Sequence, residues 1–490
     1  MGKYSVPEKI RKMKPKGTAV KPYKNGFYVY AQKHIKDEKT GKWKIKTGAY
    51  LGKIDPKQGF IPASIKISND FSVCEFGQYA FPYLAANDVK LRLEQFFGKE
   101  LGSKIYLVAI VHLVNGFSYQ KFINKYVNMS FLNLIIHKTK FGEKAISNFY
   151  SNLGLKINEI DKFEQSLYCD SKQISIDGHS IASSSNLNDL TRKGNKYPIL
   201  KNEQVNLIMG YDTQRNIPVF SQMTVGDCID SISFRETFGR RIFKDILLTI
   251  DKGFFNLENL ELIEQNGCTF IIPAKENYSY LKKLKMTAKF LSQPFIYKSN
   301  STKSVVYFEQ LKIGKRTLYG FRDLSVHAKE CADYIEKVEQ EKNGYTNEHF
   351  EEVKDNFGTV WLLTNSDLPP NKVFETYKQR WDIETFYNQI KNKLDFNALH
   401  CQNYYVEQAL AFMILVTSLI QVTLKQKLKT NKLENLDEFL MESRAIKLRK
   451  DNNIWSMVSV TMNLLNKCKS CGADLVELVK EINELETIKN

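Results

Sequence analysis

The sequence has few cysteines and histidines, the residues that bind zinc and, for cysteine, crosslink secreted proteins. It contains 8 cysteines and 7 histidines in 490 residues. No secretory signal precedes the cysteines, so we expect reduced thiols in a cytoplasmic, nucleoid-associated protein. The one close pair, Cys468 and Cys471, has no second pair and no neighbouring histidine. This pair lacks the full ligand set of a zinc site, and neither zinc binding nor a disulfide framework is predicted.

The sequence also lacks a hydrophobic run of bilayer length. The best candidate, residues 409–424, contains Thr417, Ser418 and Gln421 and falls short of the ~20 residues required to span a membrane. We therefore expect a buried core helix there and no membrane partner.

Acidic residues are scarce relative to basic ones. The chain has 71 Lys and Arg against 54 Asp and Glu, a net charge of +17, which favours a polyanionic partner. Residues 1–60 hold 16 Lys and Arg against 4 Asp and Glu, and 16 − 4 leaves +12 of that surplus. Aromatic residues are interleaved there, and residues 23–32 and 42–52 are predicted to pair as a β-hairpin around Lys39-Thr40-Gly41. Such a segment suits DNA contact, the alternative being a flexible lysine-rich tail.

Four residues further along the chain have helical spacing. On an ideal helix Tyr377, Arg380, Glu384 and Lys391 fall within a wedge of roughly 60°. One carboxylate framed by two cations and a phenol suits a metal-dependent phosphodiester enzyme, because the acid holds the ion while the cations hold phosphate. The alternative is a solvated face with i,i+3 and i,i+4 ion pairs.

Two strand-like segments lead into aspartates. Residues 173–179 alternate apolar and polar residues, which predicts a half-buried strand with Asp177 at or near its end. Residues 246–250 form a mainly apolar run that predicts a buried strand followed by Asp251. Each aspartate is also compatible with an ordinary turn. If the strands are neighbours, Asp177 and Asp251 lie side by side and form a common rim with Glu384.

The signature Tyr-x2-Arg-x3-Glu-x6-Lys, with an Asp-x-Gly-Phe segment upstream at residues 251–254, resembles the DDE transposases of bacterial insertion sequences of the family-four type. The resemblance covers roughly residues 171–402, including Gly226-Asp227 and residues 270–275. Lys252 replaces the arginine usual after the second aspartate and keeps the charge. The resemblance implies an α/β fold with a ribonuclease H-like mixed sheet flanked by helices, a β-containing insertion, and helical N- and C-terminal regions.

The sequence pattern agrees with that core. Its expected order is three strands, helix, strand, helix and strand, which predicts a mixed sheet flanked by helices. The strands are expected at residues 174–177, 205–211, 217–224, 246–251 and 269–273, and the helices at 231–243 and 256–265, with Gly267 closing the second helix.

We divide the chain into six regions. They are a basic, hairpin-containing DNA-contact region (1–70), a helical DNA-binding domain (71–170), the first part of the catalytic core (171–275), an inserted, partly β subdomain (276–358), the second part of the core with the signature helix (359–405), and a helical C-terminal region (406–490). The last region is expected either to pair subunits of a homodimer or to pack on its own core.

The chemistry expected of this site is two-metal phosphoryl transfer. Asp177, Asp251 and Glu384 would hold two Mg²⁺ (or Mn²⁺) ions. The enzyme would bind the terminal inverted repeats of an insertion sequence, cleave the double-stranded DNA ends and join them to target DNA. The alternatives are another ribonuclease H-like nuclease, and a domesticated or inactive derivative that only binds DNA.

Six side chains are predicted to contact DNA. Tyr377, Arg380 and Lys391 are expected to hold phosphates near the cut. Trp381 is expected either to stack on a flipped base or to anchor its helix to the sheet. The basic residues that follow the predicted core strands, Lys252 and Lys275, complete the set.

Overall fold

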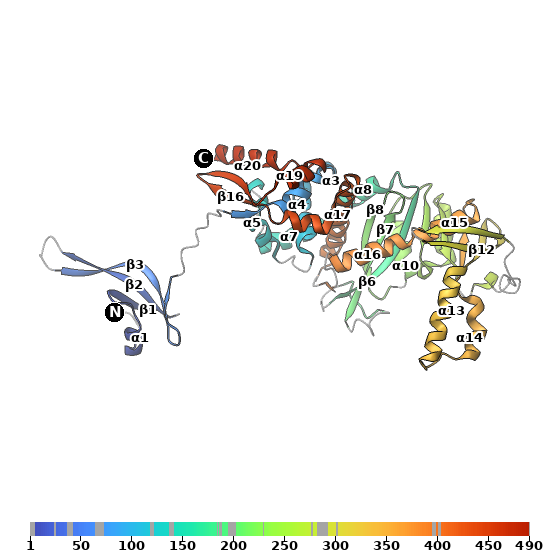
Figure 1. Cartoon of the computed structure of the whole chain (residues 1–490), viewed down its shortest axis with the longest axis horizontal. Coiled ribbons are helices and arrows are strands. Elements are labelled where there is room, and N and C mark those ends of the chain that lie inside the picture. The colour runs from blue at the N-terminus through green and yellow to red at the C-terminus, as the bar shows by residue number, and fades with distance from the viewer. Residues whose placement is uncertain are drawn as a thin grey trace. The chain divides into compact units, whose positions relative to one another are not determined.

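The computed structural model describes most of the chain: residues 5–23, 26–36, 43–63, 73–117, 122–136, 142–183, 185, 189–194, 202–228, 230–275, 278–281, 293–299, 302–393, 398–399 and 403–489. The chain divides into two compact units, residues 1–72 and residues 73–490 (Figure 1). Each is described by itself.

The smaller unit is a four-stranded antiparallel sheet with one short helix, α1 (Glu8–Lys12). The strands follow one another in the order β1 (Thr18–Tyr23), β2 (Gly26–Lys36), β3 (Trp43–Asp55) and β4 (Gly59–Pro62). Ile10 of α1 is buried with Val29 and Ile54, so the helix covers one face of the sheet. The predicted hairpin is confirmed by the pairing of β2 with β3, while its turn, Lys39-Thr40-Gly41, lies outside the described residues.

The larger unit is built on a ten-stranded sheet. Its order is β11-β12-β13-β14-β10-β9-β6-β7-β8, with β15 (Ala398–Leu399) beside β6. β9 (Leu247–Ile250) lies between β10 (Thr269–Pro273) and β6 (Gln173–Ser183) and is parallel to both. Because β7 (Glu203–Asp212), β8 (Ile217–Val225) and the strands beyond β10 pair antiparallel, the sheet is mixed and helices flank it, as predicted.

Two elements of the core differ from the prediction. β6 does not end at Asp177 but continues to Ser183, because its polar second half pairs with β7 as far as Ser183 opposite Glu203. The helix predicted at 231–243 is α10 (Asp230–Gly239) and ends four residues early, at a glycine. By contrast α11 (Leu257–Gln265) is closed by Gly267 with φ +70, as predicted.

The strands of region 276–358 extend the core sheet. β11 (Gln293–Ser299), β12 (Thr302–Ile313) and β13 (Arg316–Asp323) reach it through β14 (Thr359–Thr364). The helices α13 (Leu324–Glu339) and α14 (Asn347–Val353) lie side by side (Figure 1) and hold Tyr334 against Phe350. The β part of this insertion is therefore continuous with the catalytic core.

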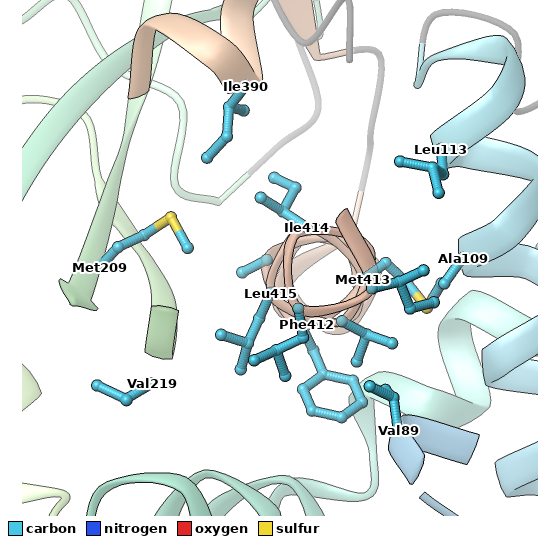
Figure 2. Packing of buried hydrophobic residues seen from close by; sticks show 14 of the residues in the cluster. Val89, Ala109, Leu113, Met209, Val219, Ile390, Phe412, Met413, Ile414 and Leu415 are labelled. Atoms are coloured by element: carbon cyan, nitrogen blue, oxygen red, sulfur yellow. The ribbon is translucent and has the colours of Figure 1, made fainter. Parts of the chain in front are cut away.

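A helical block precedes the core, as predicted. Its helices are α2 (Gly77–Ala85), α3 (Asn87–Phe97), α4 (Lys99–Asn115), α5 (Ile123–Met129), α6 (Leu132–Ile135), α7 (Glu143–Gly154) and α8 (Ile157–Tyr168). α17 (Tyr404–Thr430) joins this block to the sheet, with α4 on one side and Met209 and Val219 on the other (Figure 2). This contact buries the apolar stretch of α17.

The expectation that the apolar segment 409–424 is too short to span a membrane is wrong, because its helix continues through flanking polar residues. α17 has 27 residues. Among the described residues it is the one helix whose length and composition would allow it to cross a membrane. However, 89% of its apolar window is buried inside the protein, as expected of a core helix.

The C-terminal region 406–490 was predicted to be helical, but it also contains two strands. Between α18 (Leu436–Ser443) and α19 (Met462–Ser470) runs a hairpin of β16 (Lys447–Asp451) and β17 (Ile454–Val458), which pairs with β5 (Val73–Glu75). Asn452 and Asn453 have φ of 50° and 65°, as a tight two-residue turn requires. α20 (Leu475–Lys489) buries Leu478 and Ile482 against its own unit.

Candidate active site

Two aspartates come from neighbouring parallel strands of the core. β6 and β9 pair in parallel, with Ile176 opposite Ile250. The next residues, Asp177 and Asp251, therefore lie side by side on the sheet. Asp251 follows the end of β9, as predicted, and precedes the short helix η2 (Lys252–Phe254). Asp177 lies within β6 and not at its end.

Gly253 explains the Asp-x-Gly spacing after β9. A Cβ atom on this residue would lie 2.3 Å from the carboxylate oxygen Oδ2 of Asp230. Any other residue would force the Asp230 carboxylate to move, so glycine favours the close approach of η2 to α10 directly after Asp251.

The signature residues do not lie on one continuous helix. α15 (Pro370–Gln379) and α16 (Trp381–Lys393) meet at Arg380, with the start of α15 marked by Pro369-Pro370 as predicted. Arg380 keeps helical dihedrals, φ −55° and ψ −26°, so the side chains of Tyr377 and Glu384 still reach it. Its guanidinium lies 5.6 Å from the Tyr377 ring centroid, and its Nη2 donates to Glu384 Oε1 at 2.6 Å.

Arg380 links Glu384 of α16 to Asp251, which follows strand β9. Besides its bond to Glu384, its Nη2 lies 3.8 Å from Asp251 Oδ1. The Arg380 side chain is only 12% exposed and that of Glu384 32%, so their i,i+4 ion pair is partly buried. The Arg380 Nε is buried and has no hydrogen-bond partner among the described atoms. The guanidinium therefore lies between carboxylates with part of its bonding capacity unused.

The charges of the site act strongly on Asp177. Burial, together with the negative charges of Asp251 and Glu384, raises the pKa of its carboxyl group to about 7, although the positive charge of Arg380 opposes this shift. Burial also raises the pKa of the Tyr377 phenol, which stays protonated at neutral pH. At neutral pH Asp177 is therefore divided between its protonated and charged forms.

Tyr387, which the sequence analysis did not single out, positions the signature helix. Its hydroxyl donates to the backbone oxygen of Asp177 at 2.8 Å and contacts that of Leu207 at 3.2 Å. It lies in a buried stripe of α16 with Ile383 and Phe386. The period of this stripe was visible in the sequence, but its hydrogen bond to the strand that carries Asp177 was not.

The other predicted DNA contacts lie around the acids with different exposure. Trp381 is 68% exposed, so the alternative that it anchors α16 to the sheet is wrong. Lys252 is exposed in η2, and Lys275 is partly buried just after β10. Lys391 lies in α16, but its side chain is outside the described part of the chain.

The donor chemistry suits a divalent cation. Carboxylate oxygens are the ligands that Mg²⁺ and Mn²⁺ prefer. A cation would relieve the repulsion by Asp251 and Glu384, which adds to burial in raising the Asp177 pKa. In their present positions, the described residues include no group of three His, Cys, Asp or Glu side chains that could hold one ion. Arg380 now lies among the acids, so cation binding by all three requires this guanidinium to move.

A family model described as "Transposase DDE domain" matches residues 167–420, which is more than half of the chain. A cryo-EM structure of a piggyBac transposase synaptic complex with hairpin DNA is similar with a TM-score of 0.41 and 9% identity, over 86% of this chain and 87% of that one. No curated protein matches the sequence.

Proposed function

Because the chain belongs to the transposase DDE domain family, we propose that it cleaves the ends of an insertion sequence of the family-four type and joins them to target DNA. The observation that carries this proposal is the position of Arg380, which contacts Glu384 from the signature helix and Asp251 from the sheet. Asp177 follows Ile176 in the strand beside β9 and so lies next to Asp251, where the charge of Arg380 acts on its carboxyl group.

Asp177, Asp251 and Glu384 are the residues that would hold two Mg²⁺ (or Mn²⁺) ions. When bound, such ions would activate the attacking water or DNA 3′-hydroxyl and stabilise the leaving oxygen. Asp177 holds a proton for part of the time at neutral pH, and it would release that proton as a ligand.

Arg380 and Tyr377 would then bind the DNA backbone. Once the acids are neutralised, the guanidinium would be free to turn and bind a phosphate with its planar fork, including the Nε that is now buried without a partner. The neutral phenol of Tyr377 can donate a hydrogen bond to the same backbone. Exposed Trp381 is suited to stack on an unpaired base.

Lys252, Lys275 and Lys391 would hold phosphates on either side of the cut. Regions 1–70 and 71–170 would contact the double-stranded element ends. A homodimer, paired through region 406–490, would bring two ends together, since each copy supplies one site. Acting on the chromosome, the protein would work in the cytoplasm at the nucleoid.

Cleavage of a labelled duplex that carries the repeats flanking the reading frame tests the proposal. The wild type is expected to nick it at the repeat boundary with Mg²⁺ and to join the end to a target. Glu384→Gln and Asp251→Asn should lose about a thousandfold or more of this activity while keeping DNA binding. The matched control is Glu375→Gln, which removes an acid of α15 paired with Lys372 outside the site.

The two products separate the candidate functions. Nicking without joined product would identify a nuclease. Binding with neither product would identify a derivative that only binds DNA. Full cleavage by Glu384→Gln would contradict the site itself.

A further inference from the structure

Within the smaller unit, no described helix or strand covers the face of the sheet opposite α1. Val29 and Ile54 are buried beneath α1, so the alternate residues belong to the opposite side. The strand register brings these residues together: Lys21 is opposite Tyr28, Tyr28 opposite Lys53, and Tyr30 opposite Tyr50. The open face is defined by these residues and Tyr23.

The tyrosines of the open face contact one another at steep angles. Tyr23 and Tyr28 meet edge to face at 5.5 Å and 83°, and Tyr50 is tilted against Tyr28 and Tyr30 at 6.0 Å and 5.5 Å. Lys21 Nζ lies 5.5 Å from the Tyr30 ring centroid. The rings therefore do not form a flat platform on which successive bases could stack, although Tyr23 and Tyr50 remain 52% and 46% exposed.

The charge of the open face is basic. It carries Lys21 and Lys53, whereas the nearest acid on β3, Asp55, accepts hydrogen bonds from the backbone N–H groups of Lys57 and Gln58. Residues 1–60 as a whole hold 16 Lys and Arg against 4 Asp and Glu. Phosphate oxygens are the complementary partner of lysine and tyrosine side chains in this arrangement.

The sheet continues as a two-stranded ribbon beyond this face. Residues 32–36 of β2 pair with residues 43–47 of β3, whereas β1 pairs only as far as Ala31 and β4 only with residues 52–55. Trp43, Ile45 and Lys46 of the ribbon are exposed. The major groove of B-DNA accepts an element of this width.

We propose that the open face and its ribbon form a binding site for duplex DNA, with the ribbon in the major groove and Lys21, Lys53 and the tyrosine hydroxyls on the phosphates. This inference deepens the proposed function and rests on it for the choice of DNA as the polyanion. The tilted rings and the paired ribbon favour a duplex over a single strand.

The test compares two charge reversals within the same unit of the full-length protein. Lys21→Glu/Lys53→Glu changes the open face, and Lys9→Glu/Lys12→Glu makes the same change in net charge on α1, which covers the other face. Binding of a labelled random-sequence duplex is measured by fluorescence anisotropy in EDTA at several salt concentrations. The first variant should bind about tenfold more weakly with a shallower salt dependence, and the second should change less than about threefold.

Two aromatic variants keep the result clear if charge reversal perturbs folding. Tyr50→Phe removes only the hydroxyl, and Tyr50→Ala removes the ring as well. Phosphate contact predicts that both weaken duplex binding, whereas base stacking predicts that Tyr50→Phe binds as the wild type does. Thermal unfolding of each variant identifies loss of structure.

Several outcomes would overturn the inference. They are equal weakening by both charge reversals, wild-type binding by Tyr50→Phe, and tighter binding of the matching single strand. The repeat-cleavage assay decides the proposed function separately. Cleavage with unchanged binding by the open-face variants would refute this inference alone. Binding that depends on the open face without any cleavage would refute only the proposed function.

Discussion

Arg241 and Arg380 of the larger unit both contact carboxylates, but their surroundings differ. Arg241 lies fully buried against Glu164 at 2.8 Å, and its remaining donors reach Gln222 and the backbone oxygen of Thr237 at 2.9 and 3.0 Å. Arg380 has one short bond, to Glu384, and its Nε has no partner.

This difference distinguishes a structural ion pair, at Arg241, from the candidate active site, at Arg380. A buried pair is stable only when its donors and acceptors are satisfied, and the Arg241 cluster meets this condition where α8, α10 and β8 come together. Burial raises the pKa of an acid in both clusters: that of Glu164 beside Arg241 and, to about 7, that of Asp177 near Arg380. The clusters differ because Arg380 faces Glu384 and Asp251 with a buried Nε that has no partner among the described atoms. Charge left unsatisfied in this way is available for a metal ion and a phosphate.

The largest expected effect is on folding. Arg241→Met leaves Glu164 buried without its partner and should lower the free energy of unfolding by about 3–5 kcal/mol. Arg380→Met removes a cation from an acidic cluster and should change it by less than about 1 kcal/mol. Urea denaturation followed by circular dichroism measures both, with Arg235→Met at an exposed pair as the control. If both substitutions lower the free energy of unfolding equally, Arg380 is a structural residue like Arg241, and the contrast between the two clusters is wrong.

A smaller effect concerns pH. The Asp177 pKa of about 7 lies above its ordinary value of 3.8, so between these values the folded protein binds more protons than the unfolded one. In EDTA, the free energy of unfolding should therefore fall as pH rises from about 4 to 7. Asp177→Asn should reduce that fall by about 1–3 kcal/mol between pH 5 and pH 8.

Metal addition and a control complete this test. Mg²⁺ should stabilise the wild type at pH 8 more than it stabilises Asp177→Asn. Asp170→Asn, an exposed acid outside the site, should keep the wild-type pH dependence. If Asp177→Asn keeps the wild-type dependence of unfolding free energy on pH, the pKa of Asp177 is not raised in the folded protein.

The smallest effect is the coupling between Arg380 and Glu384. A double-mutant cycle with Arg380→Met and Glu384→Gln should give about 1 kcal/mol in EDTA, because the bond is short and partly buried. With Mg²⁺ the coupling should disappear, since Glu384 exchanges the guanidinium for the ion. The exposed Lys372 and Glu375 pair should show little coupling in either condition. If the coupling persists in Mg²⁺, Glu384 stays bound to Arg380 and does not become a ligand of the ion.

Local patterns were enough to predict much of the core. The apolar run before Asp251 specified β9, and β10 has the predicted bounds because both strands are buried on both faces and flanked by turn residues. The position of Asp251 directly after β9 and the start of α15 at Pro369-Pro370 were also predicted from local sequence. Each of these features depends on a few consecutive residues.

The remaining features depend on contacts across the fold. The second half of β6 is polar, and its pairing with β7 decides its length. The helix break at Arg380 has no glycine or proline beside it, so the sequence gives no local signal for it. The contact of Arg380 with Asp251 joins distant segments. The hairpin at Asn452-Asn453 did carry a local turn signal, which the expectation of a helical region overlooked.

The most direct test of the three-acid site uses Fe²⁺ in place of Mg²⁺. With ascorbate and peroxide, a bound Fe²⁺ ion produces hydroxyl radicals that cut the polypeptide close to its ligands. We expect fragments from cuts near Asp177, Asp251 and Glu384, all suppressed by excess Mg²⁺ and all absent in Asp251→Asn. Cuts confined to one of these segments, or unaffected by Mg²⁺, would contradict the claim that the three acids hold metal ions together.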